Sequence, residues 1–285
     1  MLDATYVGVT GYTSLAQARH VHEATRHLLG PRILMDGYLV WSEDVNKRWK
    51  GKGSDPANFA SRFLTPDEGE RVFQAPSHGS LRLIHFRTRV HTRLDEQLQD
   101  CIDRFGYGVD GFQINWILQP QPQELAEFRR NQDRHRHQTG LSNITMVLQL
   151  HPNVLARATT TGDLVRYVAK YVEQDAITHV LYDPSGGQGI GFQPDQAIGV
   201  ISRLKQEFPK LHYAAAGGLS PENVHDKVAP LWIFDPSISI DIEGQVREPN
   251  TDALDLRRSI AYVSAALDLG HQLDPEKKEG THATR

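Results

Sequence analysis

The stretch Leu181-Tyr-Asp-Pro-Ser-Gly-Gly-Gln-Gly-Ile-Gly-Phe192 decides the fold, because in it a short apolar run ends on Asp183 and enters a glycine-rich loop. Runs that are apolar on both faces are typical of parallel strands covered on both sides. In α/β barrels, catalytic groups lie where such strands end. Asp183 is therefore a candidate general acid or base. A turn that Asp183 merely caps is the alternative.

The same alternation extends outward from this stretch to both ends of the chain. Eight short runs are predicted as strands: Thr5–Thr10, Ile33–Val40, Leu81–Arg87, Gly111–Leu118, Ile144–Leu150, Thr178–Tyr182, Leu211–Ala216 and Ile238–Ile242. Most are followed by a helix-start signal, a capping side chain or an early proline. These signals stand at Ser14, Pro122, Thr161, Pro194, Pro221 and Thr251. Eight such units predict one α/β domain, a (β/α)8 TIM barrel over residues 1–272, with an open doubly wound sheet as the alternative.

Two segments depart from this spacing. The long polar segment Trp41–Ser80 predicts an inserted loop after the second strand, and a loop of this length is typical of a lid or a binding segment. The polar residues 273–285 predict a disordered C-terminal tail.

Composition narrows the class of protein. The chain has 285 residues, a net charge of -4 and one cysteine, Cys101. This balance gives no electrostatic reason to expect nucleic acid or an anionic membrane as a partner. One cysteine excludes an internal disulfide, and no apolar run approaches the ~20 residues that span a bilayer. We expect a cytoplasmic protein with a small-molecule ligand, and the oligomeric state stays open.

The stretch Ala214-Ala-Ala-Gly-Gly-Leu-Ser-Pro-Glu-Asn-Val224 resembles an anion-binding turn. Gly217 and Gly218 expose backbone amides, and Ser220 is placed to cap a helix that opens on Pro221. Barrels often place phosphate at the loops that follow the seventh and eighth strands, so a phosphate site is predicted here. A tight turn that needs two glycines would read the same.

The eighth strand carries two acidic residues, Asp241 and Glu243, whose side chains share a direction. They would repel a phosphate unless Arg247 or a neighbouring cation offsets them. The 14 histidines show no metal-ligand spacing, so neither a metal nor a cofactor is predicted. His85 and His151 are the best placed, yet a lone histidine in such a position is more often structural.

The segments Tyr182-Asp-Pro-Ser-Gly-Gly-Gln-Gly189, Gly217-Gly-Leu-Ser-Pro-Glu-Asn-Val224 and Ile240-Asp-Ile-Glu-Gly244 together resemble phosphoribosylanthranilate isomerase. This barrel enzyme of tryptophan biosynthesis rearranges an aminoaldose phosphate to a ketose. The resemblance implies that Asp183 is the general acid, which protonates the ring oxygen and opens the sugar. It implies that the Gly186–Gly187 loop and the Gly217–Gly218 turn contact the substrate or its phosphate, and that Arg48 faces the substrate carboxylate.

The chain also departs from the family pattern. Thr10 stands in Gly8-Val-Thr-Gly11 where the family has its basic cysteine, and a hydroxyl does not ionise near neutral pH as a thiol can. Glu243 and Gly244 replace paired phosphate-binding serines, and Asn115 ends the strand that the family ends in histidine. Thr10 and Asn115 are thus candidate ligand-facing residues.

Three functions remain open, and the sequence does not decide whether the protein is an enzyme. The first is a divergent isomerase-like enzyme that acts on a small sugar or carboxylate metabolite, phosphorylated or not. It would use acid/base chemistry by Asp183, supported by Asp241 or Glu243. The second is a non-catalytic descendant that binds a ligand or partner, and the third is a genuine phosphoribosylanthranilate isomerase with a relocated base.

Overall fold

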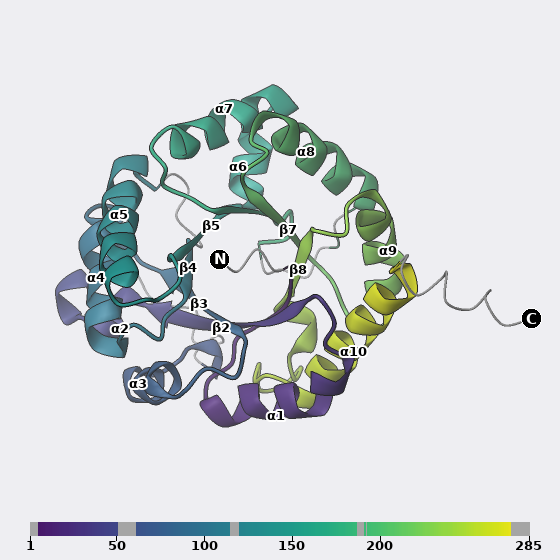
Figure 1. Ribbon diagram of the computed structural model, residues 1–285, viewed down its shortest axis with the longest axis horizontal. Helices are drawn as coiled ribbons and strands as arrows, with labels where there is room; N and C mark the ends of the chain where they lie inside the picture. Colours follow the sequence, from purple (N-terminus) through teal and green to yellow (C-terminus); the bar gives the residue numbers. More distant parts are fainter. Residues whose placement is uncertain (1–4, 51–60, 115–119, 187–190, 192, 275–285) are drawn as a thin grey trace, which may run out of the picture.

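The computed structural model describes residues 5–50, 61–114, 120–186, 191 and 193–274. Eight parallel strands close into a barrel in chain order, with β8 pairing back onto β1. They are β1 (Tyr6–Thr10), β2 (Ile33–Trp41), β3 (Leu81–Arg87), β4 (Gly111–Ile114), β5 (Thr145–Leu150), β6 (His179–Tyr182), β7 (His212–Ala216) and β8 (Ser239–Ile242). Figure 1 shows the strands as an inner ring with helices outside them. The predicted single-domain (β/α)8 barrel is confirmed.

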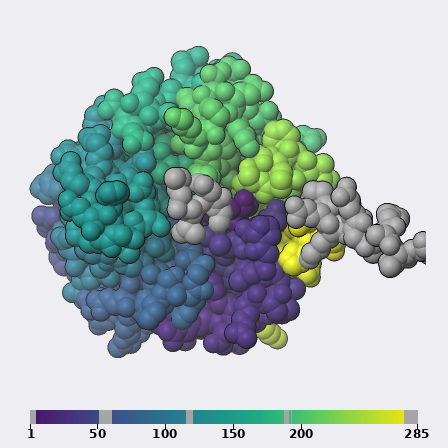
Figure 2. Space-filling model, in the orientation of Figure 1, coloured from purple at the N-terminus to yellow at the C-terminus, as the bar shows by residue number. Residues whose placement is uncertain are grey.

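Helices connect successive strands, and Figure 2 shows the units following one another around the face in chain order. The α-helices are α1 (Leu15–Thr25), α2 (Ser42–Val45), α3 (Pro66–Gln74), α4 (Leu94–Phe105), α5 (Pro122–Gln138), α6 (Pro152–Arg157), α7 (Thr161–Val172), α8 (Pro194–Glu207), α9 (Val224–Phe234) and α10 (Leu256–Leu273). Short 3-10 turns are η1 (Arg26–Leu28), η2 (Lys47–Trp49) and η4 (Gly244–Val246). Among the described helices, none is both long and apolar enough to cross a membrane.

Several predicted helix starts coincide with those in the structure. The Ser14 side chain accepts a hydrogen bond from the Gln17 amide, and Thr160 and Asp163 form a reciprocal capping box before α7. Pro122 and Pro194 each begin a helix. These starts were predictable because capping acts over three or four residues of local chain.

Two predicted starts are wrong. Helix α9 begins at Val224 and not at Pro221, because Asn223 first closes a turn: it accepts from the Ser220 amide and donates to the Gly218 carbonyl. Helix α10 begins at Leu256 and not at Thr251, and its cap is Asp255, which accepts from the Arg258 amide.

The segment Trp41–Ser80 is not one continuous loop. It contains α2, η2 and, near its end, α3, whose Thr65 cap accepts from the Glu68 amide. Val72 and Phe73 on α3 are buried in the core, so α3 is the helix that completes the second unit. The connection between β2 and α3 is thus residues 42–65, shorter than predicted, and 51–60 of it lie outside the described residues.

Two separate apolar clusters form the core. The larger lies between the strands and the surrounding helices, and the smaller fills the inside of the barrel. The members of this inner cluster are Tyr6, Met35, Leu81, Leu83, Val147, Leu181, Ala214 and Ala216. Towards the carboxyl ends of the strands the buried inward side chains become polar, with Thr10, His85 and Gln149 among them. The fold therefore presents its buried chemistry at that end, which we call the mouth.

The predicted tail begins where α10 ends at Leu273. Residues 275–285 lie outside the described residues, so the prediction of disorder there remains a prediction.

Candidate functional site

A small cavity of about 30 Å³ opens at the mouth. Six of the predicted site residues line it: Asp183, Gly186, Gly217, Gly218, Asp241 and Glu243. They come from the ends of β6, β7 and β8 and from the loops that follow. The closed barrel thus brings together residues up to sixty positions apart in sequence, as expected for an active site at strand carboxyl ends.

Asp183 follows β6 and is enclosed by the start of its own loop. Its Oδ1 accepts from the Ser185 amide at 2.9 Å, from the Ser185 hydroxyl at 2.7 Å and from the Gly186 amide at 3.2 Å. Its Oδ2 accepts from Gln149 Nε2 on β5 at 2.6 Å. Gly186 has φ +56°, a left-handed conformation that favours glycine. Asp183 therefore both caps its turn and lies buried at the mouth, so a capping role and a role as general acid or base are compatible.

Asp241 lies inside the barrel and contacts β1. The Thr10 hydroxyl donates towards both carboxylate oxygens of Asp241, at 3.0 and 3.1 Å, and is also 3.2 Å from His85 Nε2. Burial raises the pKa of Asp241 well above its ordinary value, and the nearby charges of Glu243 and Asp183 raise it further. The Thr10 hydrogen bond opposes this shift but does not cancel it. This carboxyl accordingly holds a proton more readily than an exposed aspartate.

Glu243 is surrounded by three arginines. Arg62 Nη1 donates to it at 2.9 Å while also holding Asp252 through two further bonds. Although burial raises the pKa of Glu243, the guanidinium groups of Arg87, Arg247 and Arg62 bring it below its ordinary value. The predicted repulsion between Glu243 and an anion is therefore offset, partly by Arg247 as anticipated.

Arg247 is fixed above the end of β1. It donates to the carbonyls of Thr10 and Gly11, at 2.8 and 3.3 Å. Burial lowers its pKa to about 10, so it remains charged at neutral pH. Gly11 has φ +102°, and a Cβ there would lie 1.5 Å from Arg247 Nη2, so only glycine leaves room for this arginine.

The Gly217–Gly218 turn lines the mouth cavity, with φ +114° and +62°. Both values require glycine or nearly so. Because α9 begins only at Val224, the turn is separated from the helix by residues 219–223. These glycines therefore present loop backbone to the cavity, and not the first turn of the helix.

Arg48 does not reach the mouth cavity. Its guanidinium pairs with Asp100 on α4 at 2.9 Å and stacks over Trp49, and its side chain is 46% exposed. The role that the resemblance implies for Arg48 thus gains no support from the geometry. Cys101 is also on α4, fully buried, and burial raises its thiol pKa. The predicted site residues Asn115 and Gly187 lie outside the described residues.

Sequence reasoning missed other residues at the mouth. Arg87, Gln113 and Gln149 line the cavity, and Arg62 contacts Glu243, which also lines it. The alternation of side chains along β3 and β5 could have found Arg87 and Gln149 as inward residues. His85, which the sequence singled out as well placed, contacts Thr10 inside the barrel. Nothing local identifies Arg62, which lies in the segment interpreted as loop. Within the described chain, no group of three or more His, Cys, Asp or Glu could hold a metal ion.

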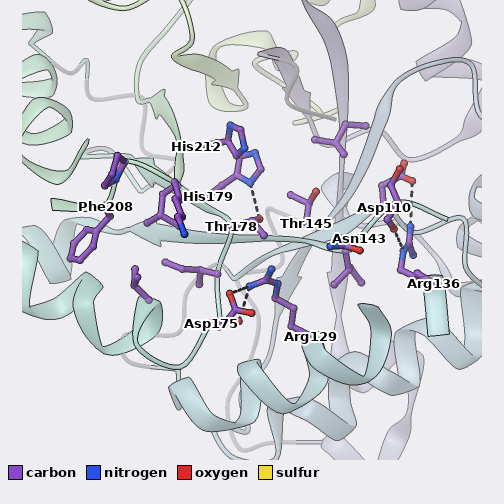
Figure 3. Close-up of a pocket in the computed structure, with 18 of the residues that line it drawn as sticks. Asp110, Arg129, Arg136, Asn143, Thr145, Asp175, Thr178, His179, Phe208 and His212 are labelled. Atoms are coloured by element: carbon purple, nitrogen blue, oxygen red, sulfur yellow. Dashed lines mark hydrogen bonds and ion pairs between the residues drawn. The ribbon is translucent and has the colours of Figure 1, made fainter. Parts of the chain in front are cut away.

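A much larger cavity, about 600 Å³, lies at the opposite end, beneath the amino ends of β5 to β7 (Figure 3). His179 and His212 stack there with ring centroids 4.7 Å apart, and Thr178 contacts His179 Nδ1 at 2.8 Å. Ion pairs of Arg129 with Asp175 and of Arg136 with Asp110 cross its walls. This cavity is on the face where barrels gain stability and not catalysis.

His179 should make the protein sensitive to acid. Burial, and then His212, lower its folded pKa from 6.5 to about 3. Below pH 6.5 the histidine therefore binds a proton in the unfolded chain but stays neutral in the folded chain, so the free energy of unfolding falls as the pH falls. At pH 5 the expected loss is about 2 kcal/mol. His179→Phe, which keeps the stacking on His212, should remove about that much of the difference in unfolding free energy between pH 7 and pH 5, measured by urea denaturation.

The matched control is His137→Phe, because His137 lies exposed on α5. It should leave the pH dependence of stability unchanged. An unchanged pH dependence in His179→Phe as well would contradict a neutral buried His179.

Comparison with solved structures places the fold. The isomerase from Pyrococcus furiosus, N-(5'-phosphoribosyl)anthranilate isomerase, aligns with a TM-score of 0.55 and 13% identity over 93% of this chain and 99% of that one. The fold is that of phosphoribosylanthranilate isomerase. The enzyme from Thermotoga maritima aligns with a TM-score of 0.57 and 16% identity, over 92% of this chain and 98% of that one.

The isomerase fold is shared with other barrels. KGPDC from Streptococcus mutans aligns with a TM-score of 0.59 and 8% identity over 95% of this chain and 99% of that one. No protein-family model matches the chain, and no curated protein sequence does. At these identities the likeness to the isomerase concerns the fold, and the chemistry must be argued from the site.

Proposed function

We propose that this protein is an acid/base enzyme on the isomerase fold, acting on a small anionic sugar or carboxylate metabolite at the mouth. The observation that carries the proposal is the pair Asp183 and Asp241, two buried carboxyl groups on one cavity with different surroundings. Asp183 faces four hydrogen-bond donors, whereas burial raises the pKa of Asp241. Pairs of carboxyls in unlike environments commonly divide the acid and base roles between them.

An aldose-to-ketose rearrangement is the reaction that best fits such a pair. One group protonates the ring oxygen as its bond to carbon breaks, and a second group removes the proton from the neighbouring carbon. The resemblance assigns the first role to Asp183. Asp241 is the second carboxyl on the same cavity. It lies beside Thr10, and Thr10 stands at the position where the family has its basic cysteine.

Charge at the mouth supports an anionic substrate. Arg87 lines the cavity, and Arg62 and Arg247 offset Glu243. The glycine turn at Gly217 and Gly218 supplies loop backbone on the same cavity, which suits a phosphate or carboxylate group. Anion binding would therefore combine the backbone after β7 with the guanidinium of Arg87 at the end of β3, across the barrel.

The second candidate is a non-catalytic binding protein. It is favoured by the small volume of the mouth cavity, about 30 Å³, and by the Arg62–Glu243 pair at its edge. A cavity of that size accommodates only a water-sized group against the described residues. On this view the mouth binds a ligand weakly or through its rim, without turnover.

A metabolite panel separates the two functions. Purified protein is incubated with sugar phosphates, sugar acids and phosphoribosylanthranilate, and melting temperature and product formation are measured for each. We expect at least one anionic sugar to raise the melting temperature and to be turned over. Ligand binding without product would favour the binding protein. The absence of both binding and product would contradict the proposal.

The family reaction is tested separately by complementation of a tryptophan auxotroph. We expect no growth, because the chain also has Glu243 and Gly244 where the family has its paired phosphate-binding serines. Growth would instead identify a genuine phosphoribosylanthranilate isomerase with a relocated base.

A further inference from the structure

Three buried side chains from three strands form a hydrogen-bonded chain inside the barrel. His85 Nε2 on β3 lies 3.2 Å from Thr10 Oγ1 on β1, which in turn lies 3.0 Å from Asp241 Oδ1 on β8. The exposed fractions of His85, Thr10 and Asp241 are 1%, 0% and 4%. Bulk water is therefore kept from the contacts of Thr10 with both partners, and the three side chains themselves set where each hydrogen lies.

The Thr10 hydroxyl has one proton and lies between two acceptors, so the chain has two self-consistent states. When Asp241 is ionised, Thr10 donates to it and His85 Nε2–H donates to Thr10. When Asp241 is protonated, it donates to Thr10, and Thr10 donates to a bare His85 Nε2. The ring then carries its proton on Nδ1. The second state holds one proton more than the first, and the imidazole is neutral in both.

The far ring nitrogen is where that proton can enter. His85 Nδ1 is buried and has no hydrogen-bond partner among the described residues. Buried polar atoms without a partner are rare, and each calls for an explanation in terms of a bound group or a chemical role. When a solvent water that reaches Nδ1 gives a proton to it and leaves as hydroxide, the Nε2 proton moves to Thr10 and the Thr10 proton moves to Asp241, which ends protonated.

We propose that Thr10 couples His85 to Asp241 in a single proton-holding unit, which takes the place of the cysteine base. The inference rests on the proposed function for its catalytic meaning, although the coupling itself does not depend on any substrate. Thr10 and His85 are positioning residues in this unit. Asp241, which lines the cavity, is the group that ends with the proton.

Electrostatics favours this distribution of charge. Burial lowers the pKa of His85 to about 4, so an imidazolium is disfavoured, whereas the pKa of Asp241 is raised. The added proton thus belongs on the carboxyl and not on the ring. The other titratable and charged groups that act on this unit are Asp183, Glu243, Arg87, Tyr6, Tyr12 and Tyr262.

Gly37 on β2 permits the contact between Thr10 and His85. A Cβ at Gly37 would lie 2.3 Å from Thr10 Oγ1 and 2.9 Å from His85 Nε2. Any side chain here would separate the two groups, because β2 runs between β1 and β3 in the barrel. The bond across β2 is thus possible only with glycine at this position.

The test is nuclear magnetic resonance of the full-length protein with ¹⁵N-labelled histidine, in which the two ring-nitrogen shifts report which nitrogen carries the proton. The His85 signals are assigned by their loss in His85→Asn. Between pH 5 and pH 9 we expect His85 to stay neutral and the chemical shifts of its two ring nitrogens to swap values, a change of tautomer that we call the exchange. The proton should be on Nδ1 at low pH and on Nε2 once Asp241 ionises.

Variants identify the cause of the exchange. Thr10→Ser keeps the hydroxyl and should keep the exchange, whereas the near-isosteric Thr10→Val should abolish it. Asp241→Asn should also abolish it, and this variant tests the same coupling if Thr10→Val does not fold. A single tautomer across the whole range in the wild type, or an exchange that persists in Thr10→Val, overturns the proposal.

The outcome is distinguishable from failure of the proposed function. An exchange that depends on Thr10 supports the coupled unit even when no metabolite is turned over, and the proposed function then fails alone. Turnover without the exchange overturns the unit and leaves the proposed function standing.

Discussion

Asp183→Asn should lower turnover of the substrate found in the metabolite panel by about 10²–10⁴-fold, the usual contribution of a general acid or base. Asparagine has the shape of aspartate but cannot donate or accept the transferred proton. Its Oδ1 can still accept from the Ser185 and Gly186 amides, which are the bonds that hold the turn. The loss should therefore appear in kcat more than in KM or in stability. Initial rates and urea denaturation measure the two effects.

Ser185→Ala provides a graded control. It removes one donor to Asp183 Oδ1 and leaves the carboxyl in place. Removing one neutral hydrogen bond of this kind costs about 1 kcal/mol, so the rate should fall by no more than roughly tenfold. Comparable turnover in Asp183→Asn and the wild type would remove Asp183 from the mechanism.

The largest effect on stability is expected from Arg136→Met. Arg136 on α5 is 2% exposed and donates to the carbonyls of Ser142 and Val109 at 2.6 and 2.9 Å. Asp110 lies 3.9 Å away (Figure 3). Methionine keeps much of the volume but leaves these buried acceptors without a donor. The unfolding free energy should fall by about 3–5 kcal/mol.

Urea denaturation measures this loss, and the melting temperature should fall by roughly 6–20 °C. Arg166→Met on α7 is the matched control, because the Arg166 side chain is 73% exposed and its ion pair in the described part of the chain is with Asp163, three residues earlier. A surface pair of this kind contributes little, so Arg166→Met should lie within about 0.5 kcal/mol of the wild type. A loss below about 1 kcal/mol in Arg136→Met would show that its carbonyl partners find other donors.

The sequence predicted those parts of the structure that depend on nearby residues. Strand β6 and Asp183 at its end lie within one short stretch, so their relation could be predicted without the fold. The second unit was mispredicted because the start signal Thr65-Pro66 lies inside a polar segment, and composition outweighed it. The presence of α3 at this position shows that a capping signal can be more informative than the polarity of the surrounding residues.

The contacts of Thr10 could not be predicted, although its departure from the family pattern was plain in the sequence. Thr10 meets Asp241 only because β1 pairs with β8 when the barrel closes. Its contact with His85 needs, in addition, a glycine on the intervening strand. Arg62 reaches Glu243 across 181 positions of sequence for the same reason. Such partners are set by closure and register, which periodicity does not report.

The inner apolar cluster has a consequence for how this protein could be altered. Its side chains, Met35, Leu83, Val147 and Leu181 among them, lie inside the barrel between the large cavity at one end and the polar groups at the other. Each end can therefore accumulate substitutions with little penalty at the other. Substitutions at the mouth can therefore change the chemistry during evolution while the opposite end keeps the barrel stable. A protein engineer could likewise stabilise that opposite end without altering the mouth.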